Sequence, residues 1–259
     1  MFGVNVRHEY LDFYQKLKPN VDFLELIVEN INSYNDDVMN SLRENYPLSF
    51  HSVSMNIGSS LDLDIDFFKA LKKNIDKFQP VLISGHLSFE QSHNMFHHDL
   101  LPFPMNQKNL KNVVQRVLQI QSLLDCELLI ENLSYYVHFE ESEMTESSFL
   151  NEICEKTGAK VLLDLNNIDI NEMNKIDEMD RFLGELNMEN VAQLHLAGGE
   201  KNGEFIVDTH ASFPKENVLK AAHTIIKKKS IPVVYERDNN FNTKNEYVKD
   251  IQLIREKIF

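Results

Sequence analysis

The stretch VAQLHLAGGEKNGEFIVDTH, residues 191–210, joins an apolar run to three side chains that can bind a metal. His195 lies near the end of the run, and Asp208 and His210 follow within fifteen residues. Near-continuous apolarity is typical of a strand that is covered on both faces, as in a parallel sheet. If other apolar runs also end in His, Glu or Asp, then those side chains meet at one edge of such a sheet.

Apolar runs of this kind recur along the chain, with helical patterns between them. Together with the first, the eight runs cover residues 2–6, 21–28, 48–53, 81–87, 126–132, 161–167, 191–197 and 231–238. Eight strands close a parallel barrel, and such barrels commonly occupy about 250 residues. The sequence therefore predicts an α/β protein with a TIM-like (β/α)8 barrel that forms a single domain over residues 1–259.

Helices are expected where apolar residues recur every three or four positions. The segments are 106–124, the stretch from Phe67 to Phe78, the stretch that ends before Gly158, the chain end after Thr243, and the segments near 10–18 and 35–45. The connection 88–105 differs because two prolines in DLLPFP (99–104) forbid a regular helix. A connection of this length is predicted to be a lid or a binding loop.

Composition excludes several classes of partner. The 26 basic and 40 acidic residues give a net charge of −14, which opposes binding to nucleic acid. There is no apolar run of the roughly 20 residues that span a bilayer, and the first residues do not resemble a signal peptide, so we expect a cytoplasmic protein without a membrane partner. Cys126 and Cys154 lack CxxC spacing and are expected to be reduced packing residues, so nitrogen and oxygen must hold any metal.

Active sites of parallel barrels lie at the C-terminal ends of the strands. Buried imidazoles and carboxylates repel or desolvate one another unless a cation lies among them. The metal-binding candidates are His51, His86, Glu131, Asp164, Asn167, His195, Asp208, His210 and Glu236. This set is too large for one ion and has no thiolate, so it predicts two or three ions of iron, manganese or zinc with open coordination positions.

Each candidate taken singly has a structural interpretation. Asp164 or Asn167 could cap a helix, and His51 or His86 could be a hydrogen-bonded core histidine. Asp208 and His210 could belong to an ordinary turn. The occurrence of such residues at several consecutive strand ends favours a metal site.

At this point the motifs resemble a known family. The blocks VDFLELIVEN, FHSVSMNIGS, SGHLSF, DLLPFP, IENLSYY, LLDLNN, QLHLAGG, IVDTH and YERD, in this order, are similar to those of the DUF692 family of multinuclear non-haem iron-dependent oxidases, which contains the methanobactin biosynthesis enzyme MbnB. The resemblance implies a barrel with two or three iron ions (Fe2+/Fe3+) at the nine positions given above.

The resemblance also implies an activity and partners. Family members use O2 to oxidise cysteine residues of a ribosomally made precursor peptide, commonly with a small partner protein that recognises the leader segment. Asp238, two residues past Glu236, is the candidate catalytic acid/base, and Asn132 is the candidate for binding the peptide substrate.

Three positions depart from the family pattern. Tyr10 stands where a histidine is usual in the opening block, Gly199 ends the HLAG block in place of a histidine, and Phe89 replaces a tryptophan. None of these is a candidate ligand, but they leave the substrate and the product open.

Two other functions remain open. Xylose isomerase-like barrels, which include sugar isomerases and phosphodiesterases, also assemble carboxylate and histidine metal sites. A non-catalytic subunit that holds a peptide at the barrel mouth is the third possibility. Iron content with ferric absorption in the visible region favours the oxidase over an isomerase, and oxygen consumption with the peptide separates it from a binding subunit.

Overall fold

The computed structural model of the chain describes residues 1–7, 14, 20–92, 95–238 and 243–259. Except for Tyr14, the helix expected near 10–18 lies outside the described residues, as does the departure at Tyr10. Both cysteines are free thiols, as expected. In the described part of the chain, no helix is both long enough and apolar enough to cross a membrane.

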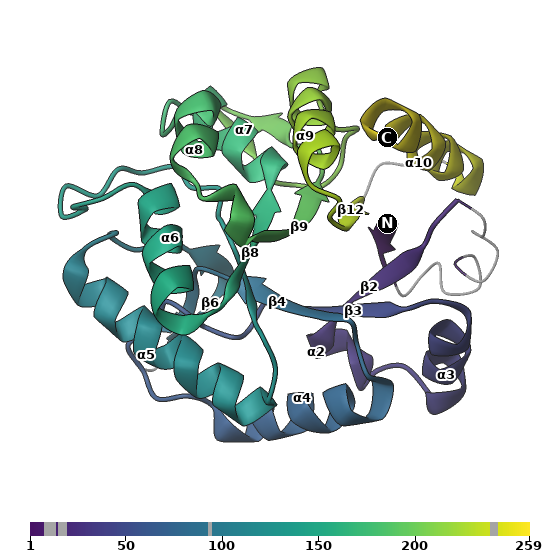
Figure 1. Cartoon of the computed structure of the whole chain (residues 1–259), viewed down its shortest axis with the longest axis horizontal. Coiled ribbons are helices and arrows are strands. Elements are labelled where there is room, and N and C mark those ends of the chain that lie inside the picture. Colours follow the sequence, from purple (N-terminus) through teal and green to yellow (C-terminus); the bar gives the residue numbers. More distant parts are fainter. Residues whose placement is uncertain (8–13, 15–19, 93–94, 239–242) are drawn as a thin grey trace.

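Eight parallel strands close into a barrel in the order β1-β12-β9-β8-β7-β4-β3-β2 (Figure 1). They are β1 (Phe2–Asn5), β2 (Phe23–Ile27), β3 (Leu48–Ser52), β4 (Leu82–His86), β7 (Leu129–Glu131), β8 (Lys160–Asp164), β9 (Val191–Leu196) and β12 (Val233–Tyr235). Seven of them lie within the predicted runs, and β8 begins one residue before its run, at Lys160. The parallel pairing of β1 with β12 closes the ring. The predicted (β/α)8 barrel is confirmed.

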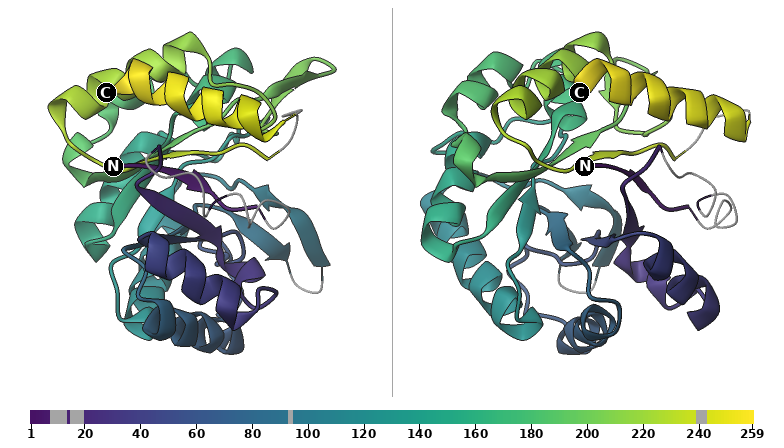
Figure 2. Two further views of the ribbon diagram at one scale, coloured as in Figure 1. Left: turned by 90° about the vertical axis from the view of Figure 1, so that its right-hand side faces the viewer. Right: turned by 45° about the vertical axis from the view of Figure 1, so that its right-hand side comes forward.

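Helices form an outer ring around the strands (Figure 2). They are α2 (Val28–Ile31), α3 (Asp36–Asn45), α4 (Ile65–Phe78), α5 (Gln107–Leu124), α6 (Glu146–Thr157), α7 (Leu165–Met173), α8 (Met179–Glu185), α9 (Glu216–Lys228) and α10 (Lys244–Ile258), with a 3-10 turn at Met188–Asn190. Thr243 caps the start of α10, and Gly158 ends α6 with a left-handed φ of 74°, so both predicted boundaries are confirmed.

The alternation of side chains along the strands places polar groups inside the barrel. Apolar neighbours such as Leu48 and Phe50 of β3 belong to the buried core, whereas Ser49 and His51 contact groups of other strands inside the barrel. Ser84 and His86 of β4 follow the same pattern. Because the side-chain period of a strand is two residues, each such strand contributes a lower and an upper polar group.

Two connections contain antiparallel hairpins that the sequence did not indicate. In the connection 88–105, which was predicted to be a lid or a binding loop without a regular helix, β5 (Phe89–Ser92) pairs with β6 (Met95–Leu101) in an antiparallel hairpin. The two prolines follow the second strand. A second hairpin, β10 (Glu200–Asn202) with β11 (Phe205–Val207), was not predicted. Both hairpins project from the same end of the barrel (Figure 2, left).

Candidate metal centre

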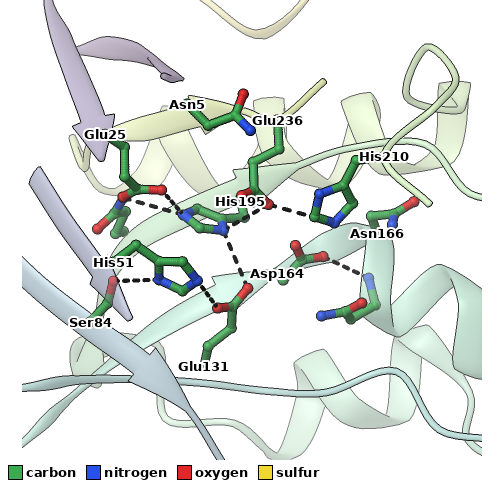
Figure 3. A network of polar contacts seen from close by, with 12 residues as sticks. Asn5, Glu25, His51, Ser84, Glu131, Asp164, Asn166, His195, His210 and Glu236 are labelled. Carbon is green, nitrogen blue, oxygen red and sulfur yellow. Dashed lines mark hydrogen bonds and ion pairs between the residues drawn. The ribbon is translucent and has the colours of Figure 1, made fainter. Parts of the chain in front are cut away.

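Glu131 lies at the middle of a buried group of histidines. Its Oε2 atom is 3.4 Å from Nε2 of His51, and its Oε1 atom is 3.2 Å from Nδ1 of His195 (Figure 3). The same Oε2 atom is 3.1 Å from Nε2 of His86. The Glu131 side chain is only 2% exposed. Four strands, β3, β4, β7 and β9, therefore bring one carboxylate and three imidazoles together.

A second group continues this cluster toward solvent. Nδ1 of His195 is also 3.0 Å from Oε2 of Glu236, which lies 3.8 Å from Nε2 of His210. Nε2 of His210 is in turn 3.0 Å from Oδ1 of Asp208. Most of these groups line a pocket of about 480 Å³ at the barrel mouth, whereas His195 lies beneath it.

Asp164 both caps a helix and faces the cluster. Its Oδ1 atom accepts the Asn167 backbone N–H at 2.6 Å at the start of α7, which explains why β8 ends three residues earlier than predicted. Its Oδ2 atom is buried without a hydrogen-bond partner, and so is Oδ1 of Asn167. Asp164, Glu131, His195 and Glu236 each offer an atom within 4.8 Å of those of the others.

The atoms left unpartnered test whether metal ions fit here. Among the described residues, the buried atoms without a hydrogen-bond partner include Glu131 Oε2, Asp164 Oδ2, Asn167 Oδ1 and His195 Nδ1. Buried polar atoms nearly always have a partner, because burying one without a partner costs about 1–3 kcal/mol. Oxygen and imidazole nitrogen atoms from different strands are the donor set of open iron, manganese or zinc sites. The residues therefore fit metal ions.

The pKa shifts of the clustered side chains also favour bound cations. Burial, and then the neighbouring Glu131 and Asp208, raise the pKa of Asp164 well above its usual value. Burial alone would lower the pKa of His195, but the surrounding carboxylates outweigh it and raise the pKa well above the usual value. Burial and the nearby imidazoles lower the pKa of His51. The protein thus concentrates groups that compete for protons, and bound cations would replace those protons.

The histidines are oriented by bonds at their other ring nitrogens. The Ser84 hydroxyl donates to the Phe50 carbonyl, so Nδ1–H of His51 donates to the Ser84 oxygen at 2.8 Å. Nδ1–H of His86 donates to the Ser52 carbonyl at 3.3 Å. Both rings then present Nε2 to Glu131 as an unprotonated atom, which is the form that binds metal.

Glu25 is a functional candidate that sequence reasoning missed. Its Oε1 atom is 2.8 Å from Nε2 of His195, and its Oε2 atom accepts hydrogen bonds from Ser49 at 3.0 Å and Gln193 at 2.6 Å. It leaves Nδ1 of His195 as the metal-binding atom. The available signal was an ionisable residue in the middle of the apolar run VDFLELIV, where a buried glutamate needs a partner.

The two remaining predicted residues have structural contacts. Asp238 accepts from Asn5 Nδ2 at 2.8 Å and pairs with Arg7 at 2.6 Å, and its Oδ2 atom lies 3.3 Å from Nδ1 of His210. Asn132 is fully buried, donating to the Asp164 carbonyl at 3.0 Å and accepting its N–H at 2.8 Å. Asn132 therefore joins β7 to β8 beneath the site, and its contact with a substrate stays a prediction.

Comparison with known proteins supports the resemblance seen in the motifs. The family model described as RiPP precursor modification enzyme MbnB/TglH/ChrH matches residues 1–258. The chain belongs to this family. Relatives of the chain include a UPF0276 protein of Psychromonas ingrahamii, which is 36% identical over 83% of this chain and 78% of that protein. A UPF0276 protein of Rhizorhabdus wittichii is 33% identical over 99% of this chain and 94% of that protein.

Solved structures show the fold of this MbnB/TglH/ChrH family member. D-psicose 3-epimerase from Clostridium cellulolyticum has a TM-score of 0.67 at 15% identity, covering 98% of this chain and 96% of that one. A xylose isomerase domain protein from Salmonella typhimurium has a TM-score of 0.66 at 12% identity, covering 99% and 96%. At these identities the likeness establishes the (β/α)8 barrel fold and leaves the activity open.

Proposed function

We propose that the chain is a multinuclear non-haem iron-dependent, O2-using oxidase that modifies cysteine residues of a ribosomally synthesised precursor peptide. Membership of the RiPP precursor modification family gives the class of enzyme. The observation that carries the finer proposal is the buried cluster of imidazoles and carboxylates with unpartnered atoms at the barrel mouth. Such a cluster suits a centre of several ions better than a single structural metal.

The proposed ligands are those predicted from the sequence. They are His51, His86, Glu131, Asp164, Asn167, His195, Asp208, His210 and Glu236. When bound, two or three iron ions would supply redox-active positions that accept a cysteine thiolate and O2. The carboxylates of the cluster would offset the positive charge of the ions, while Glu25, Ser84 and Ser52 hold the three inner imidazoles in their binding orientation.

Asp238 is proposed as the residue that accepts a proton from the substrate. Burial by itself would raise its pKa, but the hydrogen bond from His210 and the charge of Arg7 outweigh this and lower it, so the carboxylate is ionised near neutral pH. Its side chain lines the mouth pocket, where a peptide would enter. An ionised carboxylate at this place can take a proton while the iron ligands stay in position.

The shape of the mouth supports a peptide as substrate. Residues of both hairpin segments, such as Leu101 and Val207, line the pocket, and about 480 Å³ accommodates a cysteine with its immediate neighbours. A leader segment is too large for this space, which supports the expectation of a separate leader-recognising partner protein. The cytoplasmic location expected from the sequence stays a prediction.

Anaerobic loading with ferrous salt tests the proposal. We expect two or three iron ions per chain, and a ferric absorption in the visible region after exposure to air. A cysteine-containing peptide encoded beside this gene should then cause oxygen consumption and a mass change, whereas the same peptide with serine in place of cysteine should not. Zinc or magnesium binding alone would favour a sugar isomerase or hydrolase. An iron-loaded protein that consumes no oxygen with the peptide would favour a binding subunit.

A further inference from the structure

A second cavity lies beside the mouth pocket. It has a volume of about 220 Å³ and shares Pro102 and Tyr135 with the mouth pocket as lining residues. The end of the β5–β6 hairpin, the segment that follows β7, and the starts of α6 and α8 enclose it. Figure 1 shows α6 and α8 on the same flank of the barrel. We call this space the side cavity.

The side cavity combines apolar walls with one incompletely satisfied carboxylate. Phe103, Met105 and Met144 are among the apolar side chains that line it. Glu146 also lines it and is only 2% exposed. Oε1 of Glu146 accepts the Leu133 backbone N–H at 3.0 Å, but its Oε2 atom is buried without a hydrogen-bond partner.

The charges around the cavity call for a cation at Glu146. The other acid, Asp177, already pairs with Arg181 and accepts from its Nε at 2.7 Å. Glu146 has no such ion pair among the described residues, and the nearby Asp177 adds to the negative potential. Burial, opposed by the Leu133 N–H and reinforced by Asp177, raises the pKa of Glu146 to about 8. A cation placed at Oε2 would offset both the burial and the repulsion.

We propose that the side cavity binds a lysine side chain of the substrate peptide while the cysteine to be modified occupies the mouth pocket. This inference rests on the proposed function. The apolar walls suit the lysine methylene stem, and a single free carboxylate oxygen suits a compact ammonium group. An arginine fork would need two acceptor atoms to pair fully. The volume is below the roughly 300–1,000 Å³ of sites for whole small molecules, so it fits one side chain.

The test needs neither iron nor turnover, so its failure is distinct from failure of the oxidase proposal. N-acetyl-lysine methylamide is titrated against the protein and compared with N-acetyl-norleucine methylamide, which has a similar stem without the charge. We expect the lysine probe to bind at least about tenfold more tightly. In protein with 13C-labelled methionine methyl groups, the signals of Met105 and Met144 should shift with the lysine probe.

Two variants complete the experiment. Glu146→Gln keeps an acceptor for the Leu133 N–H but cannot ionise to pair with an ammonium group, and we expect it to abolish the preference for the lysine probe. Glu155→Gln, which changes an exposed glutamate of the same helix, should leave that preference unchanged. Equal binding of the two probes, a preference that survives in Glu146→Gln, or unshifted Met105 and Met144 signals in the wild-type protein would each overturn the proposal.

Discussion

Replacing Glu25 by glutamine tests how the chain prepares His195 for metal binding. The wild-type carboxylate accepts hydrogen bonds from Ser49 and Gln193 at Oε2, and its Oε1 atom forms a 2.8 Å ion pair with Nε2 of His195. A glutamine has one acceptor oxygen and one NH2 group. If its oxygen faces Ser49 and Gln193, its NH2 group faces Nε2 of His195, which must then lose its proton. The proton moves to Nδ1 and blocks the atom that faces Glu131 and Glu236.

The size of the effect follows from the lost interaction. A hydrogen bond to a charged group contributes about 1.5–3 kcal/mol, and the Oε1 contact is short and buried, with side chains 0% and 1% exposed. Loss of a carboxylate behind a metal-binding histidine weakens metal binding by about 10–100-fold, or about 1.4–2.7 kcal/mol. The two ranges agree, so we expect ferrous iron to bind Glu25→Gln about 10–100-fold more weakly.

Anaerobic competition against a coloured iron chelator measures this affinity. Glu44→Gln on the exposed side of α3 is the matched control and should bind iron as the wild-type protein does. In zinc-loaded protein with 15N-labelled histidine, His195 should carry its proton at Nε2, and this signal should change in Glu25→Gln. Wild-type iron affinity in Glu25→Gln, with the His195 signal unmoved, would refute the reasoning.

Three further outcomes are expected. Glu131→Ala or Glu236→Ala should lose at least one iron per chain together with turnover, as measured by elemental analysis and oxygen uptake, and full iron occupancy would contradict their assignment. Asp238→Asn should keep its iron but lower kcat by about 10²–10⁴-fold, so an unchanged kcat would remove Asp238 from catalysis. Because burial raises the pKa of Glu146 from 4.5 to about 8, its contribution to folding is greatest below pH 4.5 and is lost as pH rises through 8. As the pH rises from about 5 to about 9, the urea concentration at the unfolding midpoint should therefore fall less for Glu146→Gln than for the wild-type protein. Parallel declines of the two midpoints would refute the raised pKa of Glu146.

The strands were predictable because each is an uninterrupted apolar run, and their C-terminal residues were predictable because a parallel barrel brings those ends together. Residues as distant as His51 and Glu236 could therefore be assigned to one site. The alternation of inward and outward side chains along a strand was harder to predict, because an apolar run that is buried on both faces does not show which of its residues point into the barrel. For this reason Glu25, one layer below the histidines, was missed.

The connections were less predictable for a different reason. The prolines of DLLPFP excluded a helix, but the antiparallel pairing of β5 with β6 depends on contacts between two short segments with mixed polarity. The same holds for β10 and β11. The side cavity arises where four separate segments meet, so no local pattern around Glu146 indicated that its carboxylate would be buried.

The central claim is that cations hold the imidazoles and carboxylates together at the barrel mouth. Crystals grown anaerobically with ferrous iron, with diffraction data collected on both sides of the iron absorption edge, test it most directly. The account predicts two or three anomalous peaks within bonding distance of the cluster around Glu131, His195 and Glu236. Iron peaks elsewhere on the molecule, or a cluster that stays free of iron in these crystals, would contradict it.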